Sequence, residues 1–331
     1  MSNTLPATMQ AVEISAPGAP DVLKPVTRPV PQPKAHEVLI EVAATGVNGP
    51  DIMQRKGLYP APAGASDLPG LEVSGKVVAK GAAVTRWNLG DAVVALTNGG
   101  GYAEYVAADG EHCLRAPKGI SLHDAAGLPE TFFTVWSNVF IGAGLKSGET
   151  FLVHGGAGGI GTTCIQLGKA FGAKVIATDS PAARCQVCKD LGADRVIDYK
   201  TEDFVEVVRG EGGANVILDI VGGANIEKNM KAASHDARII QLAFAAGSKV
   251  EINLMPVMLK RLTYTGSTLR TRPDAFKARI ARELETQVWP LIEAGKIRVV
   301  THKFLPLAEA AAGHTLMESS QHTGKILLKV K

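Results

Sequence analysis

The sequence predicts an α/β protein with two domains, one rich in β-strands and one built on a doubly wound parallel sheet. Two observations carry this prediction. Short strand-like runs separated by turn residues fill the first third of the chain, whereas strands alternate with helices from about residue 151 onward. A chain of 331 residues, 46% hydrophobic and 20% charged, is long and apolar enough to bury the cores of two ordinary domains.

Four strand-like runs define the β-rich domain. They are HEVLIEVAATGV (36–47), LEVSGKVVAKG (71–81), GDAVVAL (90–96) and GYAEYVAA (101–108). Glycine and other turn residues separate consecutive runs, as expected for short strands in a compact β domain.

Six further strand-like runs alternate with helical runs. They are FLVHG (151–155), KVIATD (174–179), RVIDY (195–199), NVILDIVGG (215–223), ARIIQLA (237–243) and LTYTGS (262–267). Strands joined by helical crossovers indicate a doubly wound parallel sheet. A charged helix (274–295) and a closing strand, GKILLKV (324–330), follow, and we expect that strand to return to the β-rich domain. The predicted domains are residues 1–130 with 273–331, and residues 131–272.

The stretch HGGAGGIGTT (154–163) follows a predicted strand and opens a predicted helix. Without a Cβ, glycine lets the backbone approach a pyrophosphate, and the helix N-terminus supplies free N–H groups and partial positive charge. The turn therefore predicts a dinucleotide site, although a tight turn without a ligand is the alternative. Its candidate residues are Gly155, Gly156, Gly158, Gly159, Ile160 and Gly161. Asp179 ends the next strand 18 residues after Gly161, where a ribose-binding acid is expected.

Other classes of function are disfavoured. No P-loop, H-E-x-x-H or G-x-S-x-G pattern occurs, so the chemistry must come from the cofactor. A net charge of +3 does not indicate nucleic-acid binding. Acidic residues are interleaved with the basic residues from position 260 onward, as on a solvated helix face. We find no secretory signal and no membrane span, and expect a cytoplasmic protein. Cys185 and Cys188 form a C-x-x-C within a predicted helix, which favours reduced thiols over a redox pair or a zinc site.

Five motifs together resemble the zinc-free quinone oxidoreductase branch of the medium-chain dehydrogenase/reductase superfamily. They are TGVNGPDIMQRKGLYP (45–60), LPGLEVSGKV (68–77), GGGYAEYV (99–106), HGGAGGIGTT and GKILLKV. The resemblance implies a GroES-like catalytic domain, a Rossmann domain and NADPH-dependent reduction of a quinone or similar activated carbonyl. Reduction of an enone or enoyl thioester is one alternative, and a crystallin-like cofactor-binding protein with little catalysis is another.

The resemblance also implies that no metal is bound. Zinc-dependent members carry ligands at positions occupied here by Asn48 and Leu71, and only Glu72 is retained. Neither an amide nor a leucine is a useful zinc ligand, so the Lewis acid needed for alcohol oxidation is missing. Hydride donation to an electron-poor acceptor is then the expected direction.

By motif match, Asn48 and Tyr59 lie at the nicotinamide pocket. Asn48 would donate its amide N–H to a carbonyl, and Tyr59 would stack on or hydrogen-bond the acceptor; a turn residue and a loop aromatic are the alternatives. Met53 stands where some relatives carry a second tyrosine. Thr134 matches a position near the nicotinamide, unless it is only a helix-interior threonine. Phe244 follows the fifth strand of the sheet, where the backbone of family members faces the nicotinamide; core packing is the alternative.

Cofactor preference depends on the region after the second strand of the sheet. Arg184 matches a cation that holds a 2′-phosphate, and Tyr199 matches an aromatic near the adenosine. Asp179, in contrast, is typical of NAD-specific proteins. The resemblance favours NADPH, with NADH possible. It also implies a homodimer, formed by edge-to-edge pairing of the sixth strand, LTYTGS.

Overall fold

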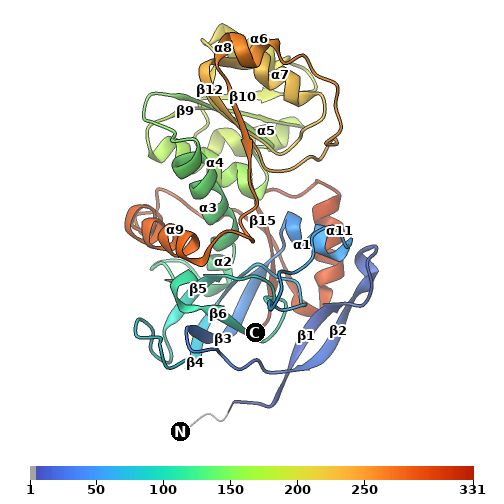
Figure 1. Cartoon of the computed structure of the whole chain (residues 1–331), viewed down its shortest axis with the longest axis vertical. Coiled ribbons are helices and arrows are strands. Elements are labelled where there is room, and N and C mark those ends of the chain that lie inside the picture. Colours follow the sequence, from blue (N-terminus) through green and yellow to red (C-terminus); the bar gives the residue numbers. More distant parts are fainter. Residues whose placement is uncertain (1–4) are drawn as a thin grey trace. The chain divides into compact units, whose positions relative to one another are not determined.

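The computed structural model describes residues 5–331, and its contacts divide the chain into two compact units. Unit 1 contains the chain up to Phe133 together with Arg270–Lys331, and unit 2 contains Thr134–Leu269. Each unit has its own sheet (Figure 1). The C-terminal strand pairs with a strand of the first third of the chain, as the sequence predicted.

Unit 1 is built on a seven-stranded, mainly antiparallel sheet in the order β14-β15-β3-β4-β5-β7, with β6 also paired to β3. Its strands are β3 (Glu37–Gly46), β4 (Glu72–Lys80), β5 (Ala92–Leu96), β6 (Tyr105–Asp109), β7 (Cys113–Arg115), β14 (Thr301–Pro306) and β15 (Lys325–Lys329). A separate antiparallel pair consists of β1 (Thr8–Ile14) and β2 (Leu23–Pro29). Val38 and Ile40 of β3 enter one apolar cluster and Leu39 enters another, so both faces of this strand are buried.

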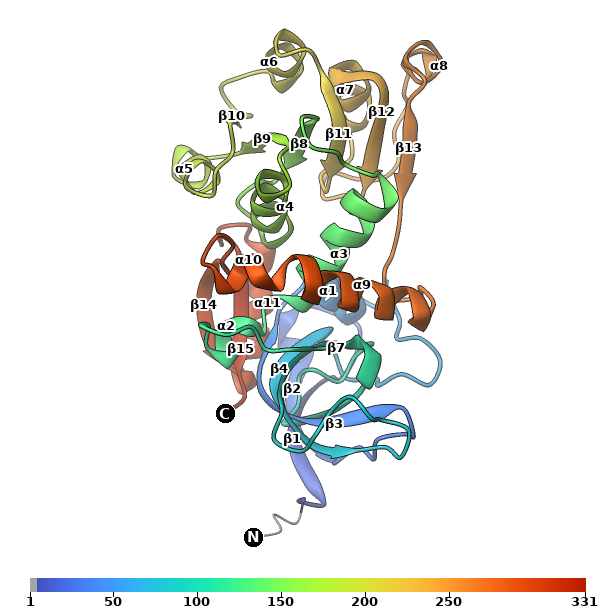
Figure 2. The ribbon, with the colours of Figure 1, turned by 90° about the vertical axis from the view of Figure 1, so that its left-hand side faces the viewer.

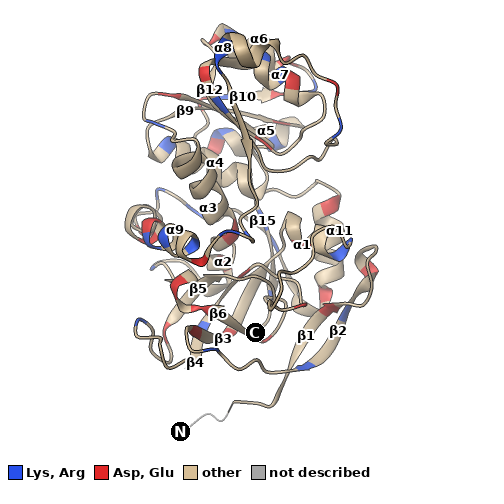
Figure 3. Ribbon diagram, viewed as in Figure 1, with Lys and Arg blue, Asp and Glu red and all other residues tan. Residues whose placement is uncertain are grey.

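Helices of unit 1 connect and cover these strands. They are α1 (Gly49–Arg55), α2 (Leu122–Ala125), α9 (Asp274–Gln287), α10 (Trp289–Glu293) and α11 (Ala310–Glu318), with 3-10 turns at Pro20–Val22, Gly110–His112 and Leu307–Glu309. The sequence predicted one charged helix over 274–295. The structure divides it after Gln287, because Pro290 has no N–H to donate in the first turn of α10. Helix α9 carries both acidic and basic residues (Figure 3), and Arg279 pairs with Glu283 at 2.6 Å.

Unit 2 contains a six-stranded parallel sheet in the order β10-β9-β8-β11-β12-β13 (Figure 2). The strands are β8 (Thr150–His154), β9 (Lys174–Asp179), β10 (Arg195–Asp198), β11 (Ala214–Asp219), β12 (Ala233–Gln241) and β13 (Thr263–Gly266). Numbered within the unit, this order is 3-2-1-4-5-6, which is that of doubly wound dinucleotide-binding sheets. The predicted fold class is confirmed.

Helices cover both faces of this sheet. They are α4 (Gly159–Ala170), α5 (Ala182–Asp190), α6 (Phe204–Gly210), α7 (Asn225–Ala232) and α8 (Met255–Lys260); α3 (Pro129–Val135) and the π-helical turn Trp136–Gly142 precede β8. Leu152 of β8 packs with Phe204 of α6 and Met230 of α7 on one face. A Cβ on Gly168 of α4 would lie 3.1 Å from Phe151, so this helix lies close against the other face. Successive side chains of a strand thus enter apolar layers on opposite faces of the sheet.

In the part of the chain that the structure describes, no helix is both long and apolar enough to cross a lipid bilayer.

Candidate active site

The glycine-rich turn joins β8 to α4 in unit 2. Gly155 takes a φ of +70°, and the N–H groups of Gly155 and Gly156 both donate to the carbonyl of Thr178 at 3.0 Å. A Cβ on Gly161 would lie 2.2 Å from the Gly155 carbonyl oxygen, so no other residue fits there. Gly158 caps α4 without a side chain, which leaves the first amides of the helix open to an anion. This turn fits the pyrophosphate of a dinucleotide.

Asp179 is turned inward against this turn. Its carboxylate accepts from the N–H of Ala157 and the N–H of Ser180, both at 2.8 Å, and from Nε of Arg184 at 2.6 Å. The residue is only 3% exposed. Sequence reasoning placed Asp179 correctly at the end of β9 but did not foresee these bonds, by which it fixes the glycine turn. The neighbouring Ser180 hydroxyl is buried and has no hydrogen-bond partner among the described residues.

Three other candidates in unit 2 lie at or near its surface. Tyr199 and Phe244 are 55% and 46% exposed, so Phe244 is not a core residue. Thr134 is half-buried in the last turn of α3, and its carbonyl accepts from Nδ2 of Asn138 at 2.9 Å. These positions leave both aromatic side chains accessible to a ligand.

A buried polar chain at the strand ends of unit 2 was missed. His154 contacts the Thr178 hydroxyl through Nδ1 at 2.8 Å and the Asn229 amide oxygen through Nε2 at 2.7 Å, and Asn229 donates to Asp219 at 2.9 Å. Burial lowers the pKa of His154. The ring is therefore neutral, with Nε2–H as donor and Nδ1 as acceptor. The available sequence signal for this chain was that polar residues stand at the ends of three strands. Their hydrogen bonds link the strand ends at the edge of the sheet that carries the glycine turn.

Cys185 and Cys188 lie inside α5 as free, buried thiols. Burial raises the pKa of both, that of Cys188 to about 12. The Cys188 sulfur lies 2.7 Å from where a Cβ on Gly156 would stand. Cys188 therefore packs against the glycine turn.

In unit 1, Asn48 caps α1, and its side-chain amide is held on both sides. Nδ2 donates to Oε1 of Glu72 at 2.9 Å, and Oδ1 accepts from Nζ of Lys325 at 2.6 Å. The backbone N–H donates to Asp51 at 2.9 Å, which closes a capping box. For the second N–H of this amide, the acceptor among the described residues is the Gly46 carbonyl, 3.5 Å from Nδ2.

Lys325 completes a triangle with Asn48 and Glu72, since its ammonium also lies 2.6 Å from Oε1 of Glu72. Both charged residues are buried, and Oε2 of Glu72 accepts from the Glu130 N–H at 2.8 Å. A Cβ at Gly46 would lie 1.9 Å from Oε1, so glycine there admits the carboxylate. Sequence analysis missed Lys325; the signal was a lysine directly before the apolar run Ile326–Leu328.

These residues do not fit a zinc ion. The Lys325 ammonium contacts the same two side chains, Asn48 and Glu72, that stand at or beside the family's ligand positions, and a second cation there would be repelled. Leu71 is buried and offers no donor atom. Among residues 5–331, no three His, Cys, Asp or Glu side chains gather in a metal-binding group.

More carboxyl groups than ammonium groups lie around this triangle. Burial raises the pKa of Asp51 to about 7, although it accepts from the N–H groups of Gly70 and Asn48. Burial, followed by the charge of Glu72, raises the pKa of Glu130 to about 8. Protons are therefore held next to Asn48 near neutral pH.

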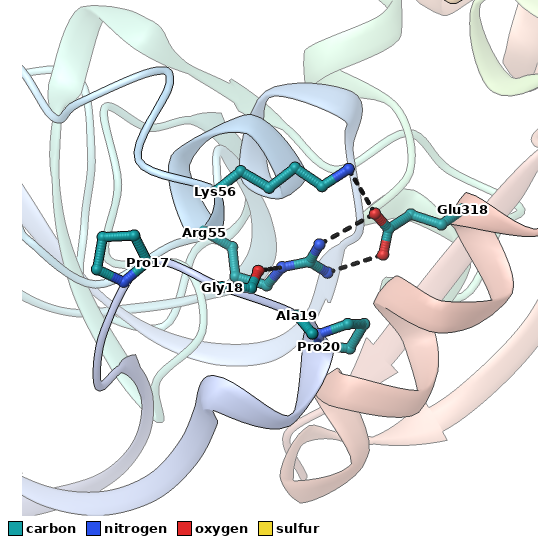
Figure 4. A pocket seen from close by; sticks show the side chains of 7 residues that line it. All are labelled: Pro17, Gly18, Ala19, Pro20, Arg55, Lys56 and Glu318. Carbon is teal, nitrogen blue, oxygen red and sulfur yellow. Dashed lines mark hydrogen bonds and ion pairs between the residues drawn. The ribbon is translucent and has the colours of Figure 1, made fainter.

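Tyr59 follows α1 and is half-buried, and the guanidinium carbon of Arg270 lies 5.6 Å from its ring centroid. The far end of α1 is fixed by Arg55, whose guanidinium pairs with both oxygens of Glu318 at 3.0 Å (Figure 4). The pocket of about 380 Å³ drawn there is lined by residues 17–20, Arg55, Lys56 and Glu318. Its charges are ion-paired, and we assign it to anchoring α1 on α11.

Comparison with known proteins agrees with this geometry. A family model described as an alcohol dehydrogenase GroES-like domain matches residues 34–118, and one described as a zinc-binding dehydrogenase matches residues 159–286. The quinone oxidoreductase of Lama guanicoe is 32% identical over 331 residues, covering 98% of each chain. The Escherichia coli quinone oxidoreductase complexed with NADPH superposes with a TM-score of 0.86 at 28% identity, covering 98% of this chain and 100% of that one. The CurK enoyl reductase gives 0.87 at 27% identity, with the same coverage.

Replacing Lys325 by Met should lower the free energy of unfolding by about 3–5 kcal/mol, because the Glu72 carboxylate is left buried without a cation. Adding Glu72→Gln should restore part of the loss. Chemical denaturation followed by tryptophan fluorescence measures both effects. Lys331→Met is the control, since it removes a solvent-exposed ion pair with Glu41 and should cost less than about 1 kcal/mol. Equal losses in the two lysine variants would contradict the structural role of Lys325.

Proposed function

We propose that this protein is a zinc-independent NAD(P)H-dependent reductase of a quinone or similar activated carbonyl. The chain belongs to the quinone oxidoreductase family of the medium-chain dehydrogenases/reductases. One observation carries this proposal. The Lys325 ammonium contacts Asn48 and Glu72, which stand at or beside the zinc-ligand positions of the family, while the glycine-rich turn before α4 keeps free amides for a dinucleotide. Without a Lewis acid, reduction of an electron-poor acceptor is the favoured direction.

Residues of unit 2 would hold the cofactor, which supplies a hydride when it is reduced. The amides at the start of α4 bind the pyrophosphate, and Asp179 keeps the turn in place through Ala157. Thr134 and Phe244 border the nicotinamide, and Arg184 and Tyr199 border the adenosine end. In this scheme residues 131–272 form the dinucleotide-binding domain, and residues 1–130 with 273–331 form the catalytic domain.

Residues of unit 1 would hold the acceptor. Tyr59 packs on the acceptor or hydrogen-bonds it. Asn48 offers an amide N–H whose one hydrogen bond within residues 5–331 is the long one to Gly46. The triangle with Lys325 keeps this donor from rotating, so its orientation is fixed before the acceptor arrives.

Enone or enoyl-thioester reduction is the second candidate, favoured by the similarity to the CurK enoyl reductase. Both reactions place a hydride beta to a carbonyl, so the same donors serve either acceptor. Assaying quinones, simple enones and enoyl thioesters with NADPH and with NADH distinguishes them. Quinone turnover exceeding the other two supports the proposal, and no turnover with any acceptor would instead favour a cofactor-binding protein with little catalysis.

Tyr59→Ala should lower kcat/KM for quinones about tenfold, because an aromatic contact to the acceptor is lost. Cofactor affinity should stay unchanged, since Tyr59 lies in unit 1. Steady-state kinetics with several quinones measure this effect. Leu58→Ala, one residue away and 66% exposed, is the control. If both variants behave like the unmodified protein, Tyr59 is only a loop residue.

We propose NADPH as the preferred cofactor, with NADH accepted. Arg184 supports this preference, because a guanidinium suits a phosphate and the side chain retains 16% exposure. Asp179 no longer opposes it strongly, since its charge is already paired.

Arg184→Ala should therefore raise KM for NADPH about ten- to a hundredfold while changing KM for NADH little. Lys189→Ala, an exposed cation at the other end of α5, is the control. Asp179→Gly, assayed alongside, should impair both cofactors by releasing the glycine turn. An unchanged NADPH/NADH ratio in Arg184→Ala would show that the 2′-phosphate lies elsewhere.

We also propose that the protein is a cytoplasmic homodimer. The four free cysteines fit a reducing compartment. Strand β13 is an edge strand with all four residues exposed, and α8 before it exposes Met255, Met258 and Leu259. Such an edge beside apolar side chains is typical of a surface that pairs with a second copy.

Light scattering should give the mass of a dimer at micromolar concentration, and the double variant Met258→Lys/Leu259→Lys should shift it toward the monomer, because charges would be buried at the contact. Leu89→Lys changes an equally exposed leucine of unit 1 and should leave the dimer intact. A monomer mass for the unmodified protein throughout the dilution series would overturn the proposal.

A further inference from the structure

Arg270 is a buried cation without a carboxylate partner. It is 6% exposed, and no Asp or Glu of residues 5–331 lies within 4.0 Å of its guanidinium. Its partners are neutral: Nη1 donates to Oε1 of Gln54 at 2.8 Å, and Nε and Nη2 donate to the carbonyl of Asn98 at 3.2 and 2.5 Å. Buried cations are normally paired, so this arrangement needs an explanation.

The guanidinium also has donors to spare. An arginine carries five N–H groups, and the three bonds to Gln54 and Asn98 use one on each nitrogen. One N–H on each terminal nitrogen of Arg270 is left without an acceptor among the described residues. Two neighbouring N–H groups on one guanidinium form a fork that suits an anionic oxygen.

A second buried cation lies beside Arg270. Nζ of Lys277 donates to the Arg270 carbonyl at 3.0 Å and to Oδ1 of Asn98 at 3.1 Å. Its nearest carboxylate belongs to Asp274, 3.9 Å away on a side chain that is 71% exposed. Burial lowers the pKa of both cations. Two neighbouring cations in a low-dielectric environment raise the local potential and favour an anion.

Other charges near this pair do not cancel it. Two acids act on Arg270: Asp51, which is buried, and Glu130, which is half-buried. Desolvation raises the pKa of Asp51 to about 7 and that of Glu130 to about 8. Near neutral pH both therefore hold much of their proton, and their opposing charge is reduced. Asp109 acts on Lys277 in addition to Asp274. The guanidinium remains the dominant charge next to the Tyr59 ring, 5.6 Å from the centroid.

We propose that Arg270, with Lys277 behind it, binds the oxygen of the acceptor that becomes negatively charged during reduction. This inference rests on the proposed function, in which Tyr59 contacts the acceptor. In the reaction, the hydride leaves a C–H bond of the reduced nicotinamide, which is thereby oxidised, and forms a new C–H bond at the carbon beta to the acceptor carbonyl. The C=C electron pair moves toward that carbonyl, whose oxygen becomes an oxyanion and later takes a proton from water. Arg270 stabilises the oxyanion in place of the missing metal ion.

A matched pair of ligands tests the anion site on the unmodified protein. The probes are 2-hydroxy-1,4-naphthoquinone, an anion at neutral pH, and its neutral 2-methoxy ether. The anion should bind about tenfold tighter or better, as measured by equilibrium titration, because charge-assisted bonds to the guanidinium are added. Equal binding of the two probes, or tighter binding of the ether, overturns the inference.

Variants then assign the site to Arg270. Arg270→Gln should abolish the preference for the anion and lower kcat for neutral 1,4-naphthoquinone about a hundredfold, with KM for NADPH unchanged. Arg270→Lys should retain part of both, since it keeps the charge and loses the fork. Arg272→Gln removes an exposed arginine that stacks on Phe276 and should change neither.

The outcomes separate this inference from the proposed function. Binding of the probes requires no turnover, so an anion preference lost in Arg270→Gln supports the site even if no quinone is reduced. Normal quinone turnover and an unchanged anion preference in a folded Arg270→Gln overturn the site alone. If Arg270→Gln does not fold, Arg270→Lys decides: a preference and a kcat equal to those of the unmodified protein overturn the role of the guanidinium fork.

Discussion

The ion pair between Lys325 and Glu72 is the constraint on which the catalytic unit depends. It joins the last strand of the chain to β4, and through Asn48 it also fixes the start of α1. A buried pair of this kind is stable only when the remaining donors and acceptors are satisfied. Here the Glu130 N–H and the Asn48 amide satisfy Glu72, and glycine at position 46 provides the room.

The same pair explains how a chain that is partly matched by a zinc-binding dehydrogenase family model can operate without zinc. A metal in such a site polarises an oxygen and holds its ligands in place. Lys325 takes over the second task, because it orders Asn48 and Glu72 as a metal would. The first task needs a cation that faces the acceptor, and the structure offers Arg270 beside Tyr59 for it. Positioning and charge stabilisation are thus divided between two residues.

In unit 2, a buried carboxylate likewise holds a binding element in place while its own charge is paired. Asp179 fixes the glycine turn through Ala157 and is itself neutralised by Arg184. The open amides of α4 are therefore held in place before a pyrophosphate arrives, and no uncompensated carboxylate faces it.

Local sequence was sufficient for what depends on neighbours in the chain. The glycine turn follows from the spacing of Gly156, Gly158 and Gly161, and the sheet follows from strand–helix alternation, so both were predicted. The partners of Asn48 were not, because Lys325 lies 277 residues away and only the folded sheet brings the two together. The charged helix over 274–295 is divided because of one residue, Pro290. Helix propensity alone did not show where the division falls. Arg270 escaped notice because one arginine within a run of basic residues carries no pattern until its burial is known.

The metal content of the purified protein tests the central claim most directly. After expression with added zinc and dialysis without chelator, elemental analysis should find far less than one zinc per chain, and activity should be indifferent to a chelator. This result is predicted because the Lys325 ammonium occupies the position facing Asn48 and Glu72. One zinc per chain, with activity lost on its removal and restored on its return, would contradict the account.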